Sequence, residues 1–168
     1  MHLVTARALT GRVPEGLAIS PNGHFVVTVN LEETTQPPGN AQRSGYASLS
    51  LFGFDPASGE LATAGDFAFD GLLPESAVFD RRRRLAVANF GHLDDPAAPG
   101  SLDFWRVVGD TSGPERWQLV KTAYALPLQR GACHCALSRQ KAGSTNFPVR
   151  ATSLTMTGRL LPILTDAS

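Results

Sequence analysis

Two glutamates and one histidine have the residue types and the spacing for acid–base chemistry. Glu15 directly follows Pro14, and Glu75 directly follows Pro74, 60 residues further along the chain. His92 lies in a polar segment that comes soon after the second glutamate. Carboxylates and imidazoles act as general bases on water when they lie beside a reactive carbonyl carbon. We therefore predict that Glu15, Glu75 and His92 are catalytic residues.

Oxygen ligands for a hard cation are spaced in a similar way. Asn30 and Asn89 each end an apolar segment, and Asp94 follows the second of these segments. Carboxylate and amide oxygens suit a divalent cation such as calcium, so Asn30, Asn89 and Asp94 are candidate metal ligands, although nothing in the sequence requires a metal. In the alternative interpretation, the asparagines cap turns through their side chains, and the acidic residues belong to a solvated loop.

The candidate residues recur because the chain contains two similar units. The segment 27–30 is echoed by 86–89, at an offset of 59 residues. The segment "SLSLFGFD" (48–55) is echoed by "SLDFWRVV" (101–108), at an offset of 53. The order is kept and only the spacing between apolar segments changes, which indicates an internal repeat. We place the two units at about residues 13–72 and 73–130.

Each unit is predicted to form four short antiparallel strands, because small or polar residues alternate with apolar ones and Asn22-Gly23 suits a tight turn. The expected strands are 16–20, 24–30, 47–54 and 61–69, then 75–79, 84–89, 101–108 and 116–125. In such an up-and-down sheet, the start of the first strand and the end of the second lie at one end. We expect the site there, together with the connections that carry Glu32, Glu33, His92, Asp94 and Asp95.

The repeat motifs resemble those of a known family. "ISPNGHFVVTVN" is similar to the signature of the YVTN-type repeat, and "LFGFDPASGELATAG" is similar to the strand and turn that follow it. Such repeats occur in lactonase-like seven-bladed β-propellers, including the 6-phosphogluconolactonase type. The resemblance covers about residues 13–138. It implies an all-β fold, a partial β-propeller of about two four-stranded blades with flanking strands. It also implies hydrolysis of a sugar-acid lactone, with a non-catalytic propeller scaffold as the alternative.

The sequence departs from the family pattern in several places. Arg81–Arg84 replace the Pro-Asn-Gly turn, and two units cannot close a ring. The segment "HLVTARAL" would be the last strand of a preceding blade, and 130–138 the first strand of a following one. We therefore expect residues 1–138 to be a piece of a propeller with little activity, which self-associates through exposed blade faces. Residues 139–168 are predicted to be an irregular tail, either out of frame or a divergent extension.

Composition limits the classes of partner that we expect the chain to bind. Lys plus Arg and Asp plus Glu number 15 each in 168 residues, so no overall charge favours nucleic acid or an anionic membrane. No signal peptide is evident, which predicts a cytoplasmic protein. Cys133 and Cys135 alternate with His134 on opposite strand faces, which argues against a zinc site. The expected ligand is a small lactone or sugar acid.

Overall fold

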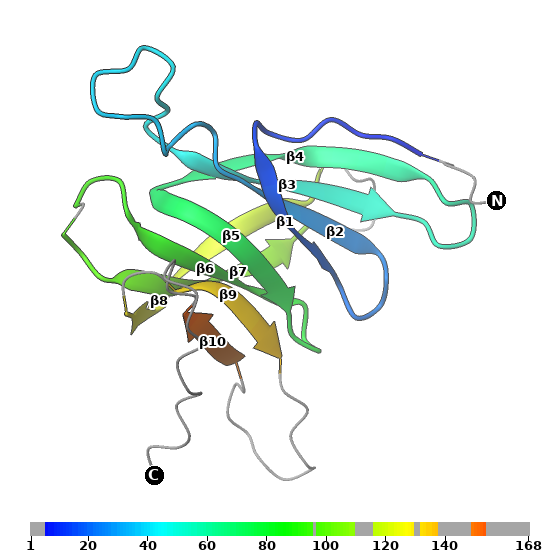
Figure 1. The fold of residues 1–168 in the computed structure, drawn as a ribbon. Coiled ribbons are helices and arrows are strands. Elements are labelled where there is room, and N and C mark those ends of the chain that lie inside the picture. The colour runs from blue at the N-terminus through cyan, green and yellow to red at the C-terminus, as the bar shows by residue number, and fades with distance from the viewer. Residues whose placement is uncertain (1–5, 96, 110–115, 130–131, 138–148, 154–168) are drawn as a thin grey trace, which may run out of the picture.

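The computed structural model describes residues 6–95, 97–109, 116–129, 132–137 and 149–153 (Figure 1). These residues form ten β-strands and no α-helix, which confirms the all-β class. Eight strands form two four-stranded antiparallel sheets in which neighbours in sequence are paired. The first sheet contains β1 (Pro14–Ile19), β2 (Phe25–Asn30), β3 (Ala47–Phe54) and β4 (Leu61–Phe69). The second contains β5 (Gly71–Phe79), β6 (Arg84–His92), β7 (Gly100–Val108) and β8 (Gln118–Leu128).

A two-stranded antiparallel sheet follows, formed by β9 (Ala132–Leu137) and β10 (Val149–Ser153). β9 packs beside β5 and β6, as β5 packs beside β1 and β2. The strand predicted within 130–138 is therefore present, in a propeller-like arrangement. β10 lies in the segment 139–168, where the sequence predicted no strand, and most of that segment lies outside the described residues. Nowhere in the described part is there a helix long and apolar enough to span a membrane.

The main core lies between the two four-stranded sheets. Apolar side chains on alternate positions of each strand meet there, including Val27, Val29, Leu49 and Leu51 from the first sheet and Leu85, Val87 and Trp105 from the second. Phe69 meets Trp105 edge to face, with ring centroids 5.5 Å apart. Phe25 meets Trp117 in the same way at 4.7 Å. The two tryptophans and Phe69 therefore pack between the units.

Matching buried polar groups support the internal repeat. Asn30 Nδ2 donates a hydrogen bond of 2.9 Å to Ser50 Oγ in the first unit. Asn89 Nδ2 donates one of 2.9 Å to Asp103 Oδ2 in the second. Both asparagines are fully buried. The matching pairs are Asn30 and Asn89, Ser48 and Ser101, and Ser50 and Asp103.

The close approach of β1 to β5 requires a glycine. A Cβ atom at Gly16 would lie 2.5 Å from the carbonyl oxygen of Glu75, and backbone cannot move aside as a flexible side chain can. We expect Gly16→Ala to lower the free energy of unfolding by about 1–3 kcal/mol, the usual cost of overpacking. Urea unfolding measures the change. Gly45→Ala is the control, because a Cβ there meets nothing within 4 Å. Equal stability of the two variants would contradict this account.

Candidate functional site

Connections from both units meet at one end of the two sheets (Figure 1). The β2–β3 connection, the β4–β5 link and the β6–β7 connection surround an open cleft of about 570 Å³. The cleft is lined from the first unit by Asn40, Arg43, Ser44 and the linking residue Asp70, and from the second by Leu93 and Asp94. The two long connections therefore share one end, as the meander predicts.

Asp70, His92 and Asp94 form a compact cluster, of which Asp70 and Asp94 line the cleft. Asp70 is the link between β4 and β5, and the β5–β6 ladder places His92 opposite Gly71. His92 Nδ1 lies 3.5 Å from Asp70 Oδ2. One ligand atom from each of the three side chains lies within 4.8 Å of the others. An imidazole held beside a carboxylate can take a proton from water through its other ring nitrogen.

Lys121 of β8 links Asp70 to a buried carboxylate. Its Nζ atom lies 2.9 Å from Asp70 Oδ1 and 2.8 Å from Asp103 Oδ2. The side chain of Asp103 is only 1% exposed, so its charge needs a partner. Burial lowers the pKa of Lys121, but hydrogen bonds to Asp103 and Asp70 outweigh burial and hold this pKa above its ordinary value. Burial raises the pKa of Asp70, but the hydrogen bond and charge of Lys121 bring it below its ordinary value.

A glutamate with a structural role fills the matching end of the first unit. Glu32 is buried, and its Oε1 accepts hydrogen bonds from Ser48 Oγ at 2.7 Å and from the Arg12 backbone N–H at 3.2 Å. Its Oε2 lies 3.4 Å from Arg12 Nε. At the position of Asp103 this unit carries Ser50, which is neutral. Within the described residues, only the second unit therefore has a lysine-bound carboxylate, Asp103, at this buried position.

Glu15 and Glu75 lie on adjacent strands at equivalent irregularities. The β1–β2 ladder skips Glu15 and the β5–β6 ladder skips Glu75, so each is the extra residue of a β-bulge. Two residues earlier, Val13 and Leu73 have φ angles of 54° and 49°, a left-handed conformation that is unfavourable for such side chains. Bulges and strained residues often re-aim side chains at functional sites. Neither glutamate belongs to the aspartate–histidine cluster, and their catalytic role stays a prediction.

The three residues predicted to bind a cation have different surroundings. Asn30 is buried in the first sheet, where its Oδ1 accepts a hydrogen bond from Thr28 Oγ1 at 3.1 Å. Asn89 is buried in the second sheet, and its Oδ1 has no hydrogen-bond partner among the described residues. Asp94 is exposed beside the cleft. The two asparagines are thus engaged in separate hydrogen-bond networks, and the proposed role of Asn30, Asn89 and Asp94 as cation ligands stays a prediction.

Three charged residues of the site were missed by the sequence analysis: Asp70, Asp103 and Lys121. Asp103 carried a usable signal, because a carboxylate between apolar residues of a predicted strand needs a buried cation. Lys121, on the next predicted strand, is the lysine available to it. Asp70 carried no such signal, because its role depends on how β5 follows β4.

No protein-family model matches the chain, and no curated protein matches it. One similar solved structure is the periplasmic gluconolactonase PpgL of Pseudomonas aeruginosa, with 14% identity and a TM-score of 0.44 over 87% of this chain and 59% of that one. Another is a putative 6-phosphogluconolactonase from Bacteroides uniformis, with 15% identity and a TM-score of 0.41 over 89% of this chain and 55% of that one. The chain thus spans 55–59% of the length of these two proteins.

Proposed function

We propose that this chain is part of a lactonase-like hydrolase that opens the cyclic ester of a sugar acid. The observation that carries the proposal is the His92–Asp70 pair beside the open cleft. The substrate class follows from the resemblance of the repeat motifs to those of lactonase-like propellers. Arg43 and Asn40 line the same cleft, and their side chains suit the hydroxyl and anionic groups of a sugar acid.

In the proposed reaction, His92 is the general base and Asp70 orients it. Because Nδ1 faces Asp70, Nε2 takes the proton from water as the water oxygen bonds to the lactone carbonyl carbon. The ring C–O bond of the tetrahedral intermediate then breaks, and the proton passes from the imidazolium to the leaving alkoxide. The product is an open-chain hydroxy acid. Lys121 is a positioning residue, since it holds Asp70 through the other carboxylate oxygen.

We expect His92→Gln to slow the enzyme-dependent hydrolysis of glucono-δ-lactone by about 100-fold or more, because a general base typically contributes that much. Acid release in a pH-stat, corrected for spontaneous hydrolysis, measures the rate. His24→Gln is the matched control, since His24 lies in the β1–β2 turn, away from this cleft. Glu75→Gln in the same assay tests the predicted role of that glutamate.

The outcome also separates the two classes of function. A wild-type chain that hydrolyses the lactone no faster than buffer would reject activity in this chain by itself, in line with the little activity expected of a piece of a propeller, and would favour the non-catalytic scaffold. A His92→Gln variant that retains full activity would instead reject the aspartate–histidine mechanism while keeping the reaction.

A further inference from the structure

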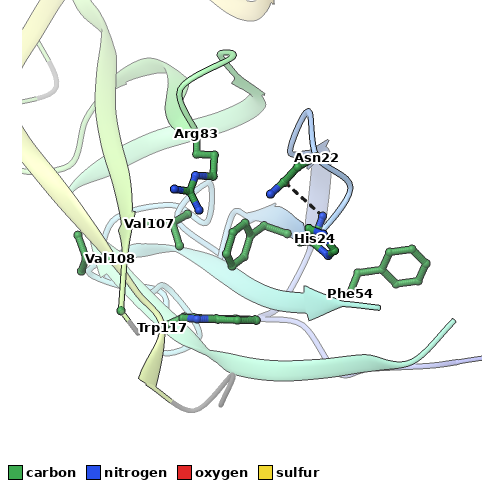
Figure 2. A pocket seen from close by; sticks show the side chains of 9 residues that line it. Asn22, His24, Phe54, Arg83, Val107, Val108 and Trp117 are labelled. Carbon is green, nitrogen blue, oxygen red and sulfur yellow. Dashed lines mark hydrogen bonds between the residues drawn. The ribbon is translucent and has the colours of Figure 1, made fainter. Parts of the chain in front are cut away.

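A second hollow lies between the two sheets at the end opposite to the cleft, where the hairpin turns meet (Figure 2). Its volume is about 300 Å³, which is at the lower limit for sites that bind small molecules. The β1–β2 turn contributes Asn22 and His24, the β5–β6 turn contributes Arg83, and Trp117 comes from the residues just before β8. The two units therefore build this hollow together.

An indole ring forms one wall of the hollow. Trp117 lies against Gly53 of β3, where any Cβ atom would collide with the ring. It also meets Phe25 edge to face, with an interplanar angle of 76°. The absence of a side chain at Gly53 thus lets the indole lie close on the strand. A flat aromatic wall of this kind favours a planar apolar ligand.

Arg83 brings a positive charge to the rim. It is one of the four consecutive arginines, whose surroundings differ in the structure. Arg84 Nε pairs with Asp80 Oδ2 at 2.7 Å, whereas Arg83 lines the hollow. Within the described part of the chain, the Arg83 guanidinium makes no hydrogen bond or ion pair. Its φ of 61° is unusual for a residue with a side chain, so the turn holds Arg83 in a strained conformation.

Among the described residues, no carboxylate in the hollow balances the charge of Arg83. None of the described residues that line it is acidic. Asp55, in the β3–β4 turn, is held within that turn by a 2.7 Å hydrogen bond from Ser58 Oγ. Asn22 Oδ1 accepts a hydrogen bond of 2.7 Å from Ser20 Oγ, which leaves Nδ2 as a donor at the rim. The rim therefore offers a cation and a hydrogen-bond donor, which together suit an anion.

We propose that this hollow binds a small planar aromatic carboxylate. The aromatic ring of the ligand packs against Trp117, and its carboxylate accepts hydrogen bonds from Arg83 and Asn22. A guanidinium binds a carboxylate through two parallel hydrogen bonds, which gives both affinity and orientation. The site lies at the other end of the sheets from the cleft, so it does not depend on the proposed lactone hydrolysis.

Benzoate is the probe for this site, with benzyl alcohol as its uncharged counterpart. Ligand-observed NMR titrations on the full chain should show saturable benzoate binding that is tighter than binding of benzyl alcohol. Arg83→Gln should weaken benzoate binding by about tenfold or more, as expected for loss of a charge-assisted hydrogen bond, and leave benzyl alcohol unchanged. Arg82→Gln is the matched control, because Arg82 is exposed on the same turn and does not line the hollow.

A second variant separates loss of the guanidinium from a change in the turn. Arg83→Gly removes the side chain and suits the positive φ, so it should fold normally and lose benzoate binding as Arg83→Gln does. Three results would overturn the proposal. They are benzoate binding no tighter than that of benzyl alcohol, an equal loss in Arg82→Gln, and no saturable benzoate binding in the millimolar range by the folded wild type.

Discussion

Replacing Lys121 by methionine should lower the free energy of unfolding by about 3 kcal/mol at neutral pH, because removal of one partner leaves a buried charge uncompensated. The group left behind is Asp103, whose side chain is 1% exposed. We take the lower end of the usual range, since a third of the Lys121 side chain is exposed and solvent screens part of its charge. Urea unfolding of the two proteins measures the difference.

The internal repeat suggests a second substitution that should restore stability to Lys121→Met. Ser50 stands in the first unit where Asp103 stands in the second, so Asp103→Ser imports a side chain that this position already accepts. The double variant Lys121→Met with Asp103→Ser should be more stable than Lys121→Met alone. If Lys121→Met loses less than about 1 kcal/mol, the scale of an exposed ion pair, Asp103 must reach water and this account is wrong.

The ion pairs of Lys121 also set how the stability difference between wild type and Lys121→Met depends on pH. The pKa of Lys121 is raised, so its contribution is fully present below about pH 10.4, the ordinary value, and is lost as pH rises through the raised value. The pKa of Asp70 is lowered, so its contribution is present above about pH 3.9 and is lost as pH falls through the lowered value. The stability gap between wild type and Lys121→Met should therefore be constant between these limits and shrink outside them.

At micromolar concentration the chain should form oligomers through the outer face of the second sheet. The exposed apolar side chains on that face are Val120, Tyr124 and Leu126 of β8, and the Tyr124 ring lies 5.5 Å from that of the buried Phe104. Tyr124 is 60% exposed and Leu126 is 38% exposed. Contiguous apolar surface is usually covered by a partner, and each aromatic side chain buries about 150–250 Å² when it packs.

The repeat shows how such a face is covered, and because β9 packs beside β5 and β6, a second copy would pack on the exposed part formed by β8. Leu102 and Phe104 occupy the repeat positions of Leu49 and Leu51, at an offset of 53 residues. Leu49 and Leu51 pack against the second sheet within the same chain. The outer face therefore has the residue pattern of a sheet–sheet contact, and another copy offers sheets of the same kind.

Sedimentation velocity tests the association. Tyr124→Lys should shift the chain toward monomer, whereas Tyr46→Lys should not, since Tyr46 is 48% exposed but lies in the β2–β3 connection. Trp105→Ala should not yield a clean monomer, because Trp105 holds the two sheets together. A wild-type chain that stays monomeric and unfolds cooperatively would contradict the expected association.

The fold could be predicted from local patterns because each strand pairs with its neighbour in sequence. Alternation along 47–54 predicts the observed bounds of β3, and the turn at Asn22-Gly23 predicts the start of β2 to within one residue. β10 was missed, because the pattern of alternation and turns that marks the other strands is absent around 149–153. The φ angles of Val13 and Leu73 were also beyond prediction, since neither residue type favours a left-handed conformation.

The candidate site could be predicted in part. His92 and Asp94 were expected at the shared end of the sheets, and the structure places them together there. The contacts of Asp70 with Lys121, 51 residues apart in sequence, depend on how the second sheet packs on the first. Asn30 and Asn89 take part in matching hydrogen-bond networks in the two units, which the repeat of the asparagine in sequence does not reveal by itself.

The strand order has a consequence for how such a chain can change in evolution. In both four-stranded sheets of the described chain, every ladder joins strands that are consecutive in sequence. Insertion or loss of four consecutive strands therefore leaves every remaining ladder intact, whereas insertion or loss of one strand would reverse the direction of all strands that follow it. Gene duplication in steps of one whole unit is thus a route by which this architecture can lengthen or shorten, and charges such as Asp103 and Lys121 can then arise in one copy alone.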